Sequence, residues 1–241
     1  METLDLKKIY ESEQSAFYKK YWGKLPASFS EVPLLYAEDL MRTPLYERLY
    51  KDEQGLVKYV SRNDKGFLIR SCLSDIKNDE LELPQGAIPL VLFTDPNEGI
   101  EQSLRCYEHG AVPYIGDLNN LPVTLICAAQ FKTNTLICDM SSLLEIVSSD
   151  EIPETIKNVY VIDSNFAKLA LLKEIQGEYS LKLFLNLPEA GIIGSVTMDE
   201  DSQLRLTPQS DIMLEAVGGK IVLTKPELST PLIRYVWDIS V

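Results

Sequence analysis

Five acidic residues recur in the middle of the chain at a nearly constant interval, each close behind an apolar run. They are Asp95, Asp117, Asp139, Asp163 and Glu189. Ligands of open α/β sheets bind at the carboxyl ends of the strands, and carboxylates gathered there could hold Mg²⁺. Aspartate is also a favoured N-cap, and we assign the four aspartates to that structural role. Glu189 differs, because it follows Pro188 and no strong helical pattern comes after it, so it is the candidate functional acid.

Strands and helices must bring these acids to one edge. Apolar runs predict five strands, at residues 88–93, 111–115, 135–138, 159–162 and 181–185. Helices are expected between them, the fourth opening at Asp163-Ser164. The acids are 22 to 26 residues apart, a period that a leucine-rich repeat can have, but its consensus is absent. The alternation therefore predicts a wound, mainly parallel sheet with flanking helices and right-handed crossovers.

The two ends of the chain have other patterns. Apolar and aromatic residues at helical spacing over residues 4–22 predict one amphipathic helix. Its aromatic groups, Tyr18, Tyr21 and Trp22, would bind a partner or, as we favour, pack on the core. Runs at 56–61 and 67–72, with turn residues between them, predict a hairpin.

Short alternating runs at 204–206, 212–216, 221–224 and 232–236 predict a small antiparallel β appendage at the C-terminus. By composition, the segment around Arg234 is an ordinary strand with a solvated arginine. The fold class is therefore α/β, divided into residues 1–82, 83–195 and 196–241 within one compact unit.

Composition excludes several classes of function. Lys and Arg number 23 against 36 Asp and Glu, a net charge of −13 that disfavours nucleic acid and anionic membranes as partners. The N-terminal residues do not resemble a signal peptide, and the longest apolar runs are too short to span a bilayer. The cysteines lack metal-ligand spacing and are expected to be buried reduced thiols in a cytoplasmic protein. The sequence contains no glycine-rich phosphate loop of the GxGxxG or Walker kind.

Three sets of motifs occur together over residues 20–241. The tail matches a G-x-L/I-V-L/V-T … P-L-I-R-Y-R-T-G-D pattern, the segment around Glu189 matches Y-G-x-T-E-x-G, and two further stretches match G-A-x-x-I-P-x-G and T-P-S-x-L. The matching segments are Gly219–Thr224 with Pro231–Tyr235, Asn186–Gly191, Gly110–Gly116 and Met140–Leu144. In this order and spacing the chain resembles the adenylate-forming (AMP-binding, acyl-activating) superfamily, in particular its phenylacetate–CoA ligase and acyl-protein synthetase branch.

The resemblance implies a nucleotide site. Glu189 would hold Mg²⁺ on the triphosphate of ATP, and Asp238 would accept hydrogen bonds from the ribose hydroxyls. Gly191 and Tyr235 would belong to the same ATP or AMP site. The implied reaction is attack of a carboxylate on the α-phosphate of ATP, which gives an acyl-adenylate and pyrophosphate. A small carboxylic acid would be the other ligand, and no catalytic residue is assigned.

The chain also departs from the family pattern. An S/T-S-G-T-T-G-x-P loop should follow the strand near Val60, but Ser61–Phe67 is S-R-N-D-K-G-F, with the negative Asp64 where phosphates would lie. Leu185-Asn186 replaces Tyr-Gly, and the segment before Asp238 is one residue short. The sequence ends three residues after Asp238, so the carboxy-terminal domain with its catalytic lysine is expected to be missing. Each lost stabilising donor should lower the rate on the order of 10²–10³-fold.

Three functions remain open. The first, which we favour, is a degenerate ligase-like protein that binds ATP or AMP with Mg²⁺, or no cofactor, and is weak or inactive unless a partner chain supplies the missing domain. The second is a non-catalytic interaction or scaffold protein on the same fold. The third is a minimal acyl-adenylating enzyme, at most an AMP-forming acid ligase.

Overall fold

A computed structural model of the chain describes most of its residues and divides them into two compact units. The described residues are 4–12, 16–48, 59–62, 68–71, 81–149, 152–166, 168–201, 203–228 and 231–237. The larger unit is Ile76–Gln209, and the smaller unit combines Met1–Asp75 with Ser210–Val241. The division at residues 82 and 195 stays a prediction.

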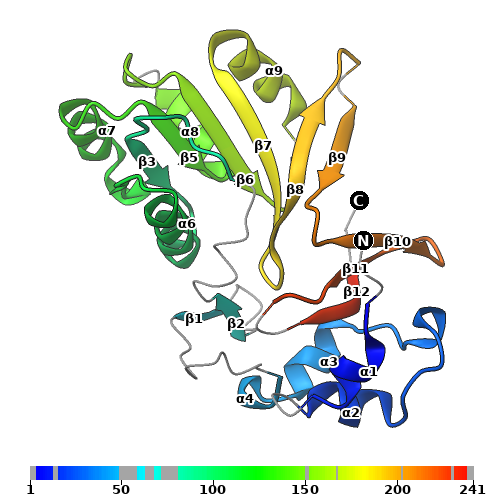
Figure 1. Ribbon diagram of the computed structural model, residues 1–241. Helices are drawn as coiled ribbons and strands as arrows, with labels where there is room; N and C mark the ends of the chain where they lie inside the picture. The colour runs from blue at the N-terminus through cyan, green and yellow to red at the C-terminus, as the bar shows by residue number, and fades with distance from the viewer. Residues whose placement is uncertain are drawn as a thin grey trace. The chain divides into compact units, whose positions relative to one another are not determined.

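The larger unit contains a seven-stranded sheet in the order β4-β3-β5-β6-β7-β8-β9 (Figure 1). Its strands are β3 (Pro89–Leu92), β4 (Tyr114–Ile115), β5 (Thr135–Cys138), β6 (Asn158–Asp163), β7 (Ser180–Leu187), β8 (Gly191–Met198) and β9 (Leu204–Pro208). The strands β3 to β7 are parallel neighbours, whereas β8 and β9 are antiparallel. The five strands predicted from apolar runs are thus confirmed as one parallel set.

Helices connect the parallel strands, as the alternating pattern predicts. They are α6 (Pro96–Glu108), the short 3-10 helix η2 (Leu118–Asn120), α7 (Leu121–Gln130), α8 (Met140–Ser149) and α9 (Leu169–Glu178). Helix α6 packs on β3, α8 on β6 and α9 on β7. Between them the sheet residues Leu90, Val91, Leu136 and Ile137 are completely buried. The wound α/β layer is therefore confirmed.

Two expectations for this unit are wrong. Helix α9 begins at Leu169 and not at Asp163-Ser164. The Asp163 carboxylate closes a local turn with the Asn165 N–H at 3.0 Å and also binds the first residue of the neighbouring helix α8. The run at 204–206 pairs with β8 in the large sheet and not with the C-terminal strands. A tight turn explains this pairing, since the carboxylate of Asp199 accepts a hydrogen bond from the Gln203 N–H at 2.8 Å.

The smaller unit combines short helices with two antiparallel sheets. The helices are α1 (Leu6–Tyr10), α2 (Phe17–Trp22), the 3-10 helix η1 (Phe29–Glu31), α3 (Ala37–Arg42) and α4 (Leu45–Arg48). The predicted hairpin is confirmed as β1 (Tyr59–Arg62) with β2 (Leu68–Ser71). The C-terminal sheet has the order β10-β11-β12, from β10 (Met213–Val217), β11 (Lys220–Lys225) and β12 (Leu232–Trp237). The predicted fold class, α/β with a separate antiparallel appendage, is confirmed.

The N-terminal aromatic residues pack inside the smaller unit. The single helix expected over residues 4–22 is two short helices, α1 and α2. Tyr18 is 1% exposed, and its hydroxyl donates to the Pro231 carbonyl at 2.7 Å and accepts from the Ile233 N–H at 3.0 Å. Phe17 and Trp22 are buried as well. The expectation that these aromatic groups pack on the core is confirmed for Tyr18 and Trp22, whereas Tyr21 is partly exposed. Tyr18 and Trp22 therefore offer no exposed surface of the kind that a scaffold role required of them.

Within the described residues, none of the helices combines the length and the apolar character that crossing a membrane requires.

Candidate functional site

Glu189 lies in the turn between β7 and β8, at the carboxyl end of the parallel strands. The turn is closed by a hydrogen bond from the Ala190 N–H to the Leu187 carbonyl at 3.0 Å. Glu189 is half-buried, and Gly191 begins β8 with a φ of 72°. Because β6 and β7 run parallel, with Asp163 paired to Leu185, the turn is at the same edge of the sheet as the strand-end aspartates. The structure thus brings Glu189 and Gly191 together.

The first two strand-end aspartates have the predicted capping role. Asp95 is the N-cap of α6, and its carboxylate accepts from the Asn97 N–H at 2.9 Å. Asp117 does the same for η2, through the Asn119 N–H at 2.9 Å. Both carboxylates are thus engaged in local turns, which needs no ligand.

The next two aspartates join neighbouring strands. Asp139 accepts from the Ser142 N–H of its own helix α8 at 2.7 Å and from the Thr94 N–H at 2.8 Å, just beyond β3. Asp163 accepts from the Met140 N–H, the first residue of α8, at 2.9 Å. Asp139 is therefore a helix cap as predicted, whereas Asp163 caps the neighbouring helix and not its own. Burial raises the pKa of Asp163.

Sequence reasoning missed Glu98, an acid on the first turn of α6. Its carboxylate accepts from the side-chain amide of Asn186, at the end of β7, at 2.9 Å. Burial, together with the nearby carboxylates, raises the pKa of Glu98 to about 8. The two residues are 88 positions apart, and only the departure at Asn186 from the family pattern marked the place.

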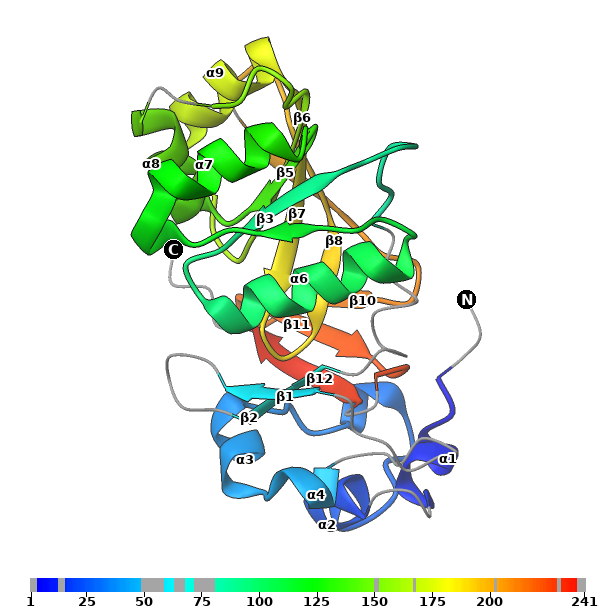
Figure 2. The same cartoon turned by 90° about the vertical axis from the view of Figure 1, so that its left-hand side faces the viewer.

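Helix α6 runs past the β7–β8 hairpin (Figure 2), and it carries a buried arginine, Arg105, close to Gly191. Arg105 is 2% exposed and pairs with Glu101 at 2.8 Å. A Cβ atom at position 191 would lie 3.0 Å from an Arg105 guanidinium nitrogen. Glycine is therefore favoured at position 191 for two reasons: the backbone is left-handed there, and a side chain of α6 approaches closely.

We expect Gly191→Ala to lower the free energy of unfolding by more than Gly86→Ala. Both glycines have a positive φ, 72° and 73°, but a Cβ at Gly86 would meet nothing within 4 Å. The shared strain of a left-handed alanine costs about 1–2 kcal/mol, and contact with Arg105 adds to it only at position 191. Urea unfolding followed by far-UV circular dichroism measures both variants. Equal losses of unfolding free energy in the two variants would show that contact with Arg105 does not contribute to the cost at position 191.

The remaining predicted residues belong to the smaller unit. Tyr235 is on β12, is 5% exposed, and pairs with Leu223 and, by an isolated bridge, with Leu35. Asp238 lies outside the described residues, as do residues 63–67 of the altered loop. In the described parts of the chain, no group of three or more His, Cys, Asp or Glu side chains is placed to hold a metal ion.

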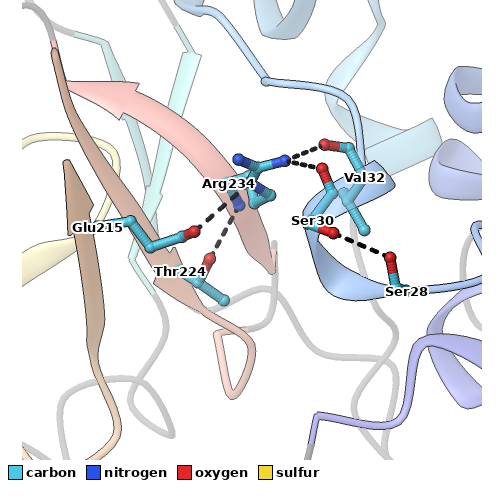
Figure 3. A network of polar contacts seen from close by, with 6 residues as sticks. All are labelled: Ser28, Ser30, Val32, Glu215, Thr224 and Arg234. Atoms are coloured by element: carbon cyan, nitrogen blue, oxygen red, sulfur yellow. Dashed lines mark hydrogen bonds and ion pairs between the residues drawn. The ribbon is translucent and has the colours of Figure 1, made fainter. Parts of the chain in front are cut away.

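Arg234, beside Tyr235, is not solvated as expected. It is 7% exposed, and its guanidinium donates to the carbonyls of Ser30 at 3.0 Å and Val32 at 2.6 Å (Figure 3). The same group lies 3.4 Å from the Glu215 carboxylate, and the Arg234 N–H donates to the Thr224 hydroxyl at 2.9 Å. The arginine thus ties the N-terminal segment to the C-terminal sheet inside the smaller unit.

No family model matches the sequence, and no curated protein matches it. The structure, however, is similar to solved ligases. The o-succinylbenzoate CoA synthetase (MenE) of Bacillus subtilis, in complex with the acyl-adenylate OSB-AMP, aligns with a TM-score of 0.58 and 10% identity over 80% of this chain and 44% of that one. The amide bond synthetase McbA of Marinactinospora thermotolerans aligns with a TM-score of 0.55 and 9% identity over 72% of this chain and 40% of that one. VinN in complex with L-aspartate aligns with a TM-score of 0.53 and 9% identity over 75% of this chain and 51% of that one.

This chain therefore has the mixed α/β fold found in adenylate-forming ligases, which the motif resemblance implied. It spans about half or less of the length of the three solved proteins described above. At this identity the likeness concerns the fold. The phenylacetate–CoA ligase branch stays a prediction.

Proposed function

We propose that this chain is a ligase-like protein of the adenylate-forming kind that binds a small carboxylic acid or its adenylate and catalyses adenylation weakly or not at all. The observation that carries the proposal is the shared fold, with Glu189 in a turn at the carboxyl edge of the parallel strands. Related folds in the comparison hold an acyl-adenylate or an amino acid, which supports a small-molecule ligand here. We place the protein in the phenylacetate–CoA ligase and acyl-protein synthetase branch and in the cytoplasm. A partner chain that completes the site stays a prediction.

Weak catalysis follows from charge. The S-R-N-D-K-G-F segment at residues 61–67 lacks the small residues that let backbone N–H groups approach phosphates. The carboxyl edge of the large sheet carries Asp139 and Asp163. A triphosphate is repelled by such carboxylates unless a cation lies between them.

The half-buried Glu189 suits Mg²⁺, a hard cation that proteins bind through one or two carboxylates with substrate phosphates completing the shell. When bound, Mg²⁺ would neutralise phosphate charge at the reacting group. Glu189 itself would contribute one oxygen ligand, and Gly191 would keep the turn open beside it.

Two assays on the full chain test the proposal. Thermal shift with AMP, with ATP and Mg²⁺, and with a panel of aryl and alkyl carboxylates should show saturable stabilisation by at least one ligand. ATP–pyrophosphate exchange should be undetectable or several orders of magnitude below that of a complete ligase assayed in parallel. Glu189→Gln should remove the Mg²⁺-dependent part of nucleotide binding, whereas Glu174→Gln, on the exposed face of α9, should not.

Robust exchange that depends on Glu189 would instead establish a minimal acyl-adenylating ligase. Absence of stabilisation by every nucleotide and acid would contradict ligand binding and leave the interaction or scaffold role.

A further inference from the structure

Asn186, on β7 close to the Glu189 turn, has a hydrogen-bond acceptor that no described residue satisfies. Asn186 is 4% exposed, and its amide nitrogen points at Glu98, 2.9 Å away. Its carbonyl oxygen is buried and has no hydrogen-bond partner among the described residues. Buried polar atoms in native proteins almost always have a partner, so an orphaned amide oxygen on a residue whose nitrogen already binds a carboxyl group indicates a missing donor.

Gln102 extends the same pattern by one helical turn. It follows Glu98 by four residues on α6, and residues at that spacing share one face of a helix. Gln102 is completely buried, and neither its side-chain oxygen nor its nitrogen has a partner in the described chain. Glu98 and Gln102 on one face of α6, with Asn186 against Glu98, thus contribute a carboxylate and two unpartnered amide oxygens.

The electrostatic field at Glu98 favours a cation. The charged groups that raise its pKa are carboxylates of α6 and of the strand ends: Glu101 on α6, Asp95 before it, Asp139 after β5 and Asp163 at the end of β6. Arg105, the nearby cation on the same helix, is paired with Glu101 at 2.8 Å. An anionic ligand would be repelled here, while a cation would stabilise the ionised form of Glu98.

We propose that Glu98, Asn186 and Gln102 form a binding site for the primary ammonium group of a small molecule. A primary ammonium has three N–H donors and no acceptor, which matches one carboxylate and two amide oxygens. A quaternary ammonium carries the charge without the donors. Glu98 is only half-buried, so the ligand can approach it from solvent. The proposal concerns binding alone and does not rest on nucleotide binding or adenylation.

Proton release distinguishes this site from simple charge attraction. Because the pKa of Glu98 is about 8, the group is mostly protonated at neutral pH and must lose its proton when the cation binds. Binding should therefore release about one proton per chain near pH 7, and the affinity should rise about tenfold from pH 6 to pH 7.

Isothermal titration calorimetry of the full chain with butylammonium chloride measures both quantities. Titrations run in pairs of buffers that lack primary amines and differ in ionisation enthalpy. We expect one saturable site with proton release, and no comparable binding of tetramethylammonium chloride or sodium butyrate. No saturable binding of butylammonium, equal binding of tetramethylammonium, or binding without proton release would overturn the proposal.

Variants assign the site to residues. Glu98→Gln should weaken binding at least tenfold and abolish proton release, whereas Asn186→Leu should weaken binding and keep the proton release. Glu174→Gln, an exposed acid on α9, should change neither. Since the pH dependence of the unmodified chain is measured first, the proposal stays testable even if a variant fails to fold. Unchanged binding in folded Glu98→Gln would place the ammonium elsewhere and overturn the assignment.

Discussion

Replacing Arg234 by alanine is expected to lower the free energy of unfolding of the smaller unit by roughly 3–5 kcal/mol, because it removes one member of a buried charged network. The guanidinium satisfies two carbonyl groups, of Ser30 and Val32, and lies 3.4 Å from the Glu215 carboxylate. Without it, the buried Val32 carbonyl loses its side-chain donor. Both tryptophans of the chain, Trp22 and Trp237, belong to the smaller unit. Urea unfolding followed by tryptophan fluorescence therefore reports this unit directly.

Three further variants test the explanation. Arg205→Ala removes an exposed arginine that is 3.4 Å from Asp199, and such a surface pair contributes about 0–1 kcal/mol to stability. Because Arg205 is in the larger unit, the loss of stability in this variant is measured by far-UV circular dichroism. Arg234→Lys keeps the charge but lacks the planar guanidinium, so its free energy of unfolding should lie between those of Arg234→Ala and the natural chain. Arg234 has a φ of 52°, so Arg234→Gly should be about 1–2 kcal/mol more stable than Arg234→Ala. A loss below about 1 kcal/mol for Arg234→Ala would contradict the network's role.

The parts of the fold that the sequence predicts are those set by local patterns. The strands β3, β5 and β6 are apolar runs that the sheet buries on both sides, and their spacing leaves room only for crossover helices. The caps at Asp95 and Asp117 are equally local, because each aspartate binds an N–H two residues ahead. Local chemistry of this kind can be inferred before any contact between distant segments is known.

What the sequence does not predict depends on contacts between distant segments. Asp163 binds the first residue of α8 because β5 and β6 are neighbours, whereas its own helix begins only at Leu169. Arg234 looks like a solvated strand residue until the carbonyls of residues 30 and 32, about two hundred positions earlier, are brought beside it. Glu98 and Asn186 are joined in the same way. The candidate site is thus predicted at Glu189 and Gly191 and missed at Glu98.

The stability of the larger unit should fall as the pH rises from 5 to 8, because of Glu98. Its pKa is about 8 in the folded chain against an ordinary value of 4.5, so the folded state holds a proton that the unfolded state has released. The unfolded chain therefore binds fewer protons over this window, and the free energy of unfolding decreases with pH, by about 3 kcal/mol in total if Glu98 acts alone. Below pH 4.5 the contribution is fully present.

Glu98→Gln isolates this contribution, because glutamine resembles the protonated acid and does not titrate. The variant should unfold like the natural chain at pH 5 and be more stable by roughly 3 kcal/mol at pH 8, in urea titrations followed by far-UV circular dichroism. Asp163, whose pKa burial also raises, produces a slope of the same sign that both proteins share, so it cancels in the difference. Glu174→Gln should have the same free energy of unfolding as the natural chain at every pH. If Glu98→Gln and the natural chain lose stability in parallel, Glu98 is ionised at neutral pH and its surroundings already supply the cation that we assign to a ligand.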